Sequence, residues 1–195
     1  RAVRTLPTKE AKILAEAVNQ NVKLSCPFIF RSTMQHRGVL VLKGGFSDNI
    51  SDTDPGYRTK GKINYENDFK FSEPFDDDEN SKYASNIVNE FIEQSHKILD
   101  SHEINLKRRK KGFMPANVII TRDAGIEIPK LRKFKKWMSI AYIPLEIGIS
   151  TLSSIKLFSF KYPELKNYDV YQNLYNGLKE AIAFSIKTLK KQCNN

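Results

Sequence analysis

The sequence has few of the side chains that bind metals or form disulfides. Its 195 residues include 2 cysteines, Cys26 and Cys193, and 3 histidines, His36, His96 and His102. The cysteines lie near opposite ends, and no Cys-x-x-Cys or paired Cys/His spacing occurs. Disulfide frameworks and zinc sites both depend on such spacings. We therefore expect no disulfide framework and no metal ligands in this chain.

Long apolar runs and several catalytic signatures are also missing. No stretch reaches the roughly 20 apolar residues that a membrane helix needs, and no secretory signal precedes the first helix, so we expect a cytoplasmic protein. Gly-x-Ser-x-Gly, Walker and Gly-x-Gly-x-x-Gly motifs do not occur. The chain opens at Arg1 and closes on Cys-Asn-Asn, which we interpret as a piece of a longer polypeptide holding part of an active site.

Positive charge is abundant. The 32 lysines and arginines exceed the 22 aspartates and glutamates, for a net charge of +10. This excess suits nucleic acid, an acidic membrane or a phosphorylated ligand, and lysine-rich solubility also explains it. With 40% hydrophobic and 28% charged residues, the chain is expected to be globular. Its length fits one domain or one domain plus an extension, and we take residues 1–195 as a single domain.

Helical and strand periodicities alternate along the chain. The apolar spacing predicts helices over 8–19, 81–99, 131–137, 144–152 and 168–191, and strands over 26–31, 37–43, 116–121 and 155–160. Thr8 is the expected N-cap of the first helix. The last helix is expected to bury the side formed by Leu174, Leu178, Ala181, Ile182, Ser185 and Leu189.

These elements predict an α/β fold, specifically an α+β two-layer sandwich. We expect a mixed, largely antiparallel sheet with helices packed mainly on one face. The first two strands are sequential and should pair antiparallel through residues 32–35. Residues 44–80 show little periodicity, and a loop of that length inside a domain is often a binding loop or lid.

Two short polar segments are candidates for binding an anion or moving a proton. His36 and Arg37 stand at the entry to a strand, where the planar guanidinium can hold a phosphate or carboxylate through two hydrogen bonds. Asp52 and Asp54 lie in Ser-Asp-Thr-Asp-Pro-Gly, where a carboxylate can accept a proton from a substrate hydroxyl. Taken alone, each segment is more simply explained as an ordinary solvated turn.

A third candidate runs from 102 to 117 and continues at 122–125. Its amide and guanidinium groups can donate to an anion, and its glycines allow a close backbone approach. The donors are Asn105, Arg108, Asn117 and Arg122. A basic surface loop or a nucleic-acid patch over 107–111 is the alternative interpretation. Interleaved aromatics and a helix-turn-helix pattern are missing, which makes nucleic acid the less favoured partner.

Together these segments resemble the archaeal-type, cofactor-independent phosphoglycerate mutases of the alkaline phosphatase superfamily. The resemblance extends from the first residues to about Gly125. It rests on Arg1-Ala-Val-Arg4, His36-Arg-Gly-Val-Leu-Val-Leu42, Ser47-Asp-Asn-Ile-Ser-Asp-Thr-Asp-Pro55, Ile87-Val-Asn-Glu-Phe91, Ser95-His-Lys-Ile-Leu99, His102-x-Ile-Asn105-x-x-Arg108, Lys111-Gly-x-x-Pro-Ala-Asn117 and Arg122-x-Ala-Gly125.

The resemblance implies that this chain is the inserted substrate-binding domain of such an enzyme. A core domain outside the chain would supply the serine nucleophile and two divalent metal ions (Mn, Mg or Zn), so the segment alone should be inactive. The substrate would be 2- or 3-phosphoglycerate. Asp52 would exchange protons with the glycerate hydroxyls, supported by Asp54. His36, Arg37, Asn105, Arg108, Asn117 and Arg122 would contact the substrate anion.

One residue departs from the family pattern. Asp123 stands where the family usually has glycine in Arg-Gly-Ala-Gly, and its carboxylate could pair with Arg122 or face solvent. Two other functions stay open at this point. The chain could be a basic nucleic-acid-binding module, or the insert of a related metalloenzyme that acts on another phosphorylated or phosphonate substrate.

Overall fold

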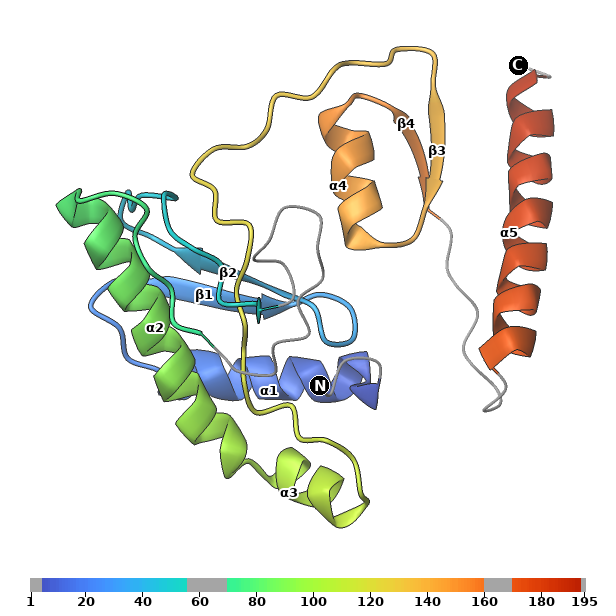
Figure 1. Cartoon of the computed structure of the whole chain (residues 1–195). Coiled ribbons are helices and arrows are strands. Elements are labelled where there is room, and N and C mark those ends of the chain that lie inside the picture. The colour runs from blue at the N-terminus through green and yellow to red at the C-terminus, as the bar shows by residue number, and fades with distance from the viewer. Residues whose placement is uncertain (1–4, 56–69, 160–169, 194–195) are drawn as a thin grey trace. The chain divides into compact units, whose positions relative to one another are not determined.

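A computed structural model describes residues 5–55, 70–159 and 170–193 (Figure 1). The chain divides into two compact units, Arg1–Ile128 and Pro129–Asn195. The first unit contains α1 (Thr8–Asn21), β1 (Phe28–Ser32), β2 (Gly38–Leu42), α2 (Glu79–Asp100) and α3 (Glu103–Lys110). The second contains β3 (Met138–Ala141), α4 (Pro144–Leu152), β4 (Lys156–Ser159) and α5 (Val170–Cys193).

Helix α1 packs against β1 and α2 (Figure 1). Its buried side carries the apolar residues that the helical spacing indicated: Ala11, Leu14, Ala15 and Val18. The expected cap differs, because Pro7 occupies the N-cap position and no side chain caps the helix. The Thr8 hydroxyl instead accepts a hydrogen bond from the Gln35 amide at 3.0 Å, which ties the start of the helix to the turn between β1 and β2.

Strands β1 and β2 form the predicted antiparallel hairpin. Phe28 pairs with Leu42 and Ser32 with Gly38. The rings of Phe28 and Phe30 lie 5.6 and 5.7 Å from the ring of Phe91 on α2, centroid to centroid. Phe91 is fully buried, so this aromatic cluster joins the hairpin to the longest helix of the unit.

Helices α2 and α3 follow one another with a short break at 101–102. Asp78 caps α2 by accepting from the Asn80 amide at 2.7 Å. His102 caps α3, its Nδ1 accepting from the Ile104 amide at 3.2 Å. The sequence did not predict α3, because its run of lysine and arginine gives little amphipathic signal.

In the second unit, β3 and β4 pair in parallel, from Met138 opposite Lys156 to Ala141 opposite Ser159, and α4 connects them. The mixed α/β class is thus confirmed. In place of one largely antiparallel sheet, however, the described residues form two separate two-stranded sheets, one antiparallel and one parallel. None of the helices in the described ranges combines the length and apolar composition needed to cross a bilayer.

Two predicted elements differ in the structure. Residues 116–121 do not form a strand. The amides of Ala116 and Thr121 donate to the side chains of Asn105 and Thr53, in place of the backbone carbonyls of a neighbouring strand. Residues 131–137 do not form a helix, because their backbone bonds to distant partners: the Phe134 amide donates to Ser153 and the Trp137 carbonyl accepts from Lys156.

Helix α5 has the predicted amphipathic period but not the predicted burial. The expected buried side is largely open in the described part of the chain, with Leu178 61% exposed. Leu174, Ile182 and Leu189 are likewise about half exposed. Periodicity indicates which residues share a face of a helix and does not determine what covers that face.

Candidate functional site

The strongest candidate site forms where the loop at 48–54 meets the segment at 121–126. Three side chains of the loop bind backbone amides of the segment. The Asp48 carboxylate accepts from the Ile126 amide at 3.3 Å, the Asp52 carboxylate from the Asp123 amide at 2.9 Å, and the Thr53 hydroxyl from the Thr121 amide at 2.8 Å. Residues about 70 positions apart in the sequence are therefore brought into contact.

Thr53 is the centre of this junction, and sequence reasoning missed it. Its side chain is fully buried. Its own amide donates to the Thr121 carbonyl at 2.9 Å, and the two hydroxyls lie 3.2 Å apart. A threonine between two aspartates gives no signal of burial in the sequence. A buried hydroxyl needs such partners, so Thr53 fixes the backbone that carries Asp52 and Asp54.

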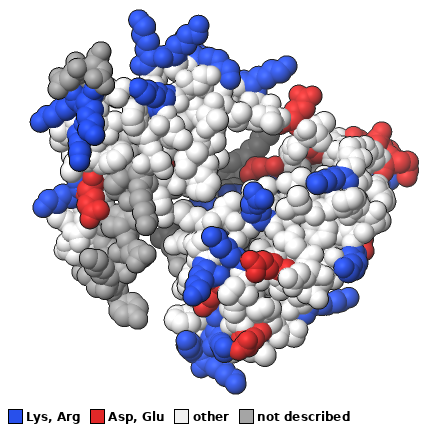
Figure 2. All heavy atoms as spheres, turned by 180° about the vertical axis from the view of Figure 1, so that it is seen from behind, with Lys and Arg blue, Asp and Glu red and all other residues white. Residues whose placement is uncertain are grey.

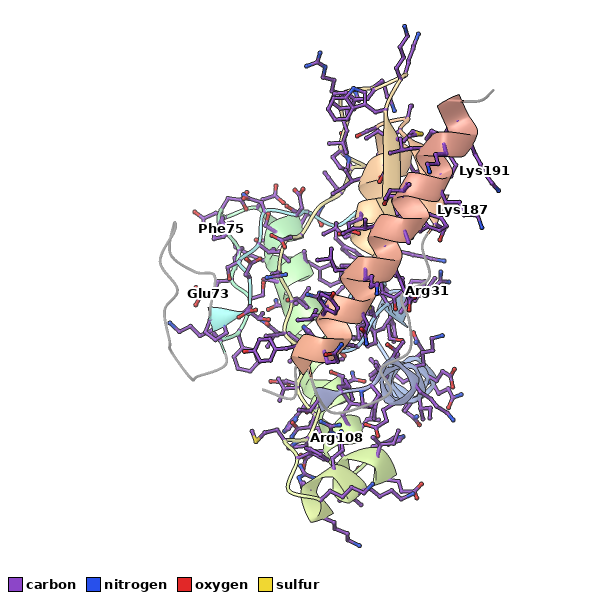
Figure 3. All side chains as sticks on the ribbon, turned by 90° about the vertical axis from the view of Figure 1, so that its right-hand side faces the viewer. Arg31, Glu73, Phe75, Arg108, Lys187 and Lys191 are labelled. Atoms are coloured by element: carbon purple, nitrogen blue, oxygen red, sulfur yellow. The ribbon has the colours of Figure 1, made fainter. Side chains whose placement is uncertain are left out.

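The other side of the loop is anchored to α2. The Ser51 hydroxyl accepts from the Glu73 amide at 2.9 Å, and the Ser72 hydroxyl donates to the Ser51 carbonyl at 2.8 Å. Asn89 on α2 holds Ser72 through both of its backbone groups, at 2.7 and 2.9 Å. Figure 3 labels Glu73, whose amide makes the bond to Ser51. Hydrogen bonds thus hold loop 48–54 on two sides, to segment 121–126 and, through residues 72 and 73, to α2.

The two candidate carboxylates differ in exposure. Asp52 is half-buried, whereas Asp54 is buried at 6% exposure. Arg122 and Asp123 are both exposed, and the Arg122 Nε lies 3.5 Å from the Asp123 Oδ2. The structure therefore brings Asp52 and the Arg122–Asp123 pair to one junction. A guanidinium can bind an anion and a half-buried carboxylate can accept a proton, so the junction holds both kinds of group.

The backbone conformation at position 123 explains why aspartate can replace the glycine that the family usually has there. The φ angle of Asp123 is 57°, in the left-handed region that glycine adopts readily and that aspartate and asparagine tolerate better than other residues. Position 123 therefore has a backbone conformation suited to glycine. Aspartate satisfies the same backbone requirement and adds a carboxylate next to Arg122.

His36 and Arg37 lie in the turn between β1 and β2, and both are exposed. The Thr33 amide donates to the Arg37 carbonyl at 2.8 Å and the Arg37 amide to the Met34 carbonyl at 3.0 Å. Gln35, which lies within this turn, has a φ of 51°. The turn thus presents both side chains at the surface.

Asn105 lies at the junction of α2 and α3 and is fully buried. Its Nδ2 donates to the carbonyls of Leu99 at 2.8 Å and Ala116 at 3.1 Å. Its Oδ1 accepts from the Ala116 amide at 2.8 Å. These contacts use both of its donor hydrogens, so in this structure Asn105 holds the segment at 116 against the helices.

Arg108, labelled in Figure 3, is only 4% exposed and donates to groups of its own chain. Nε and Nη2 donate to the Met114 carbonyl at 3.1 Å, and Nη2 also donates to the Thr5 hydroxyl at 2.7 Å. Nη1 donates to the Thr5 carbonyl at 2.9 Å and to Glu10 at 3.0 Å. Five contacts match the five N–H groups of a guanidinium.

Asn117 belongs to a surface cluster beside the end of α2. Its Nδ2 donates to the Asp100 carboxylate at 2.6 Å, and its carbonyl lies 2.8 Å from the His96 Nδ1. Arg109 also pairs with Asp100. The hydrogen bond from Asn117, followed by that from Arg109, lowers the pKa of Asp100 below its ordinary value of 3.8.

On the face shown in Figure 2, lysine and arginine side chains lie interspersed with acidic and uncharged ones. Among the residues that the structure describes, no three His, Cys, Asp or Glu side chains gather to hold a metal ion. The described residues therefore do not fit a metal, and we derive no chemical step through one in this chain.

Comparison with known proteins identifies the family. Residues 1–105 match the family model of 2,3-bisphosphoglycerate-independent phosphoglycerate mutase. A mutase of that name from Aeropyrum pernix is 42% identical over 136 residues, covering 64% of this chain and 32% of the relative. One from Methanosphaera stadtmanae is 41% identical over 149 residues, covering 73% and 34%. The chain thus spans about a third of these relatives.

A solved structure shares the fold. The cofactor-independent phosphoglycerate mutase from Thermoplasma acidophilum superposes with a TM-score of 0.51 at 23% identity, covering 91% of this chain and 44% of that one. At that sequence identity, the structural similarity is evidence for a shared fold only. The match over residues 1–105 carries the family assignment: the chain belongs to the 2,3-bisphosphoglycerate-independent phosphoglycerate mutase family.

Proposed function

We propose that this chain is the inserted, substrate-holding domain of an archaeal-type phosphoglycerate mutase that interconverts 2- and 3-phosphoglycerate. Family membership and the coverage of about a third of each relative support this proposal. The observation that carries it is the junction of loop 48–54 with segment 121–126, where Asp52 accepts a hydrogen bond from residue 123 next to Arg122.

In this proposal Asp52 exchanges a proton with the glycerate hydroxyls. The bond from the Asp123 amide holds one carboxylate oxygen in place and leaves the other available as an acceptor. Asp54, which is buried, supports the loop. Arg122 binds the carboxylate or phosphate, because its exposed guanidinium can offer several hydrogen bonds to a planar or tetrahedral anion.

His36 and Arg37 are proposed as further anion contacts from the exposed hairpin turn. Asn117 could contribute only the second N–H of its side-chain amide, because the first donates to Asp100. For Asn105 and Arg108 the observed contacts support a framework role. We therefore leave these two buried residues out of the proposed anion site.

A core outside this chain would supply the serine that carries the phosphoryl group and the two divalent metal ions (Mn, Mg or Zn). When bound there, the metals would stabilise charge on the transferring phosphoryl group. The task of this chain is then to hold and orient the glycerate. Positioning accounts for much of the catalysis in phosphoryl transfer, so a domain without the reacting serine can still control the rate.

Direct binding tests the proposal on the chain itself. A calorimetric titration with 3-phosphoglycerate should show binding to the wild type. Arg122→Gln should weaken that binding about tenfold or more, which corresponds to the loss of one charge-assisted hydrogen bond. The matched control Arg132→Gln removes the same charge from the second unit and should leave the affinity unchanged. Equal affinities for the wild type and Arg122→Gln would contradict the proposed anion site.

A chimera tests the catalytic part. The matching segment of the Aeropyrum pernix relative would be replaced by residues of this chain and assayed for mutase activity. We expect activity in the chimera, none in the isolated chain, and a loss of about 100-fold or more in the Asp52→Asn chimera, the usual contribution of acid–base catalysis. Full activity of the Asp52→Asn chimera would remove Asp52 from the mechanism. A panel of other phosphorylated and phosphonate compounds would show whether another substrate is preferred.

A further inference from the structure

We infer that Asp123 is a positioning and affinity-setting residue of the proposed site: its backbone holds Asp52 while its side chain restrains Arg122. The inference rests on the proposed function. It is motivated by two contacts of the same residue, the amide bond to Asp52 at 2.9 Å and the approach of its Oδ2 to the Arg122 Nε at 3.5 Å. The sequence raised pairing of Asp123 with Arg122 as one option and gave no indication of the contact with Asp52.

The backbone contact depends on the left-handed conformation at Asp123. Its φ of 57° turns the chain so that the amide of 123 can donate to Asp52. The segment is fixed on both sides of this point, by Thr53 at residue 121 and by Asp48 at residue 126. The segment therefore rests on the loop at three places, and residue 123 is the middle one. A residue that resists this φ would disturb the contact with Asp52.

The side-chain contact competes with an anionic ligand. Arg122 can bind a phosphate or carboxylate best when its guanidinium is not shared with a protein carboxylate. The pair is exposed, at 45% for Arg122 and 85% for Asp123, so solvent and salt weaken it. A surface pair of this kind changes affinity by at most about fivefold. Asp123 should therefore lower anion affinity modestly and leave the fold unchanged.

The test uses variants that separate the two contacts. Asp123→Asn keeps a side chain that tolerates left-handed φ and removes the charge. Asp123→Ala removes the charge and also strains the backbone. Asp77→Asn is the matched control, because it removes one charge from an exposed acidic residue before α2. Affinity for 3-phosphoglycerate is measured by calorimetry on the whole chain at low and high salt.

We expect Asp123→Asn to bind 3-phosphoglycerate about two- to fivefold more tightly than the wild type, with a smaller gain at high salt and no change in Asp77→Asn. Tighter binding cannot result from simple damage to the structure. If the wild type binds and Asp123→Asn binds equally or more weakly, the inference is overturned. If the wild type does not bind phosphoglycerate, the proposed function fails instead.

A second measurement needs no ligand. In the wild type, the hydrogen bond to Asp52 should slow amide hydrogen exchange at residue 123, and Asp52→Ala should accelerate that exchange several-fold. Asp123→Asn should keep the slow exchange, whereas Asp123→Ala should lose it. Unchanged exchange at residue 123 in Asp52→Ala would refute the positioning role, whatever the ligand data show.

Discussion

Replacing Arg108 by methionine should destabilise the first unit without directly affecting an anion site. The substitution keeps an unbranched apolar stem and removes the guanidinium that reaches Thr5, Glu10 and Met114. Resemblance to the family predicts that Arg108 binds substrate, whereas its 4% exposure and five internal contacts indicate a framework residue. The two roles predict different outcomes for the same variant.

The expected loss is about 2 to 4 kcal/mol in the free energy of unfolding. Breaking a buried ion pair costs about 3–5 kcal/mol when the remaining partner stays buried. Here Glu10 is 36% exposed and regains water, which reduces that cost. The carbonyls of Thr5 and Met114 also lose their donors, but both residues are exposed and water can replace the lost hydrogen bonds. The expected loss therefore lies below the full value for a buried pair.

Urea unfolding followed by far-ultraviolet circular dichroism measures the loss. The single tryptophan, Trp137, lies in the second unit, so its fluorescence reports on the wrong part of the chain. Lys110→Met is the matched control, because Lys110 is exposed on the same helix and should change stability by less than about 0.5 kcal/mol. Arg108→Lys should also lose stability, since an ammonium offers three donors in place of five.

One result would refute this reasoning. If Arg108→Met unfolds at the same urea concentration as the wild type but no longer binds 3-phosphoglycerate, Arg108 contacts the ligand and the internal contacts contribute little. A double-mutant cycle with Glu10→Gln gives a further check, because residues in direct contact should show a coupling energy of about 0.5 kcal/mol or more.

Two further predictions concern the junction and the surface cluster. Thr53→Val should cost about 1–3 kcal/mol, because the Thr121 amide loses its buried acceptor; hydrogen exchange at Thr121 should accelerate, and an unchanged rate would contradict this. Asp100 has a folded-state pKa lowered by Asn117 and then Arg109, so its stabilising contribution is present above about pH 4 and disappears as the pH falls through the folded value. Asp100→Asn should therefore weaken the acid dependence of unfolding, and an identical pH profile in both proteins would count against that contact.

The sequence alone determined much of the secondary structure and the family. The antiparallel hairpin and four of the five helices in the described residues follow from local apolar spacing, because periodicity acts over a few neighbouring residues. The order of polar motifs up to about Gly125 indicated the mutase family, which the match over residues 1–105 confirmed. Such motifs are recognisable without knowing which side chains touch.

Only the tertiary structure decided which polar side chains face solvent and which hold the framework. Asn105 and Arg108 look like ligand-binding residues in the sequence, yet both are buried and bonded to their own chain. Thr53 gave no signal, and Asp123 stood out only as a departure from the family pattern, yet they join loop 48–54 to segment 121–126. Hydrogen bonds across about 70 residues depend on the path of the chain in space, and no local pattern encodes that path.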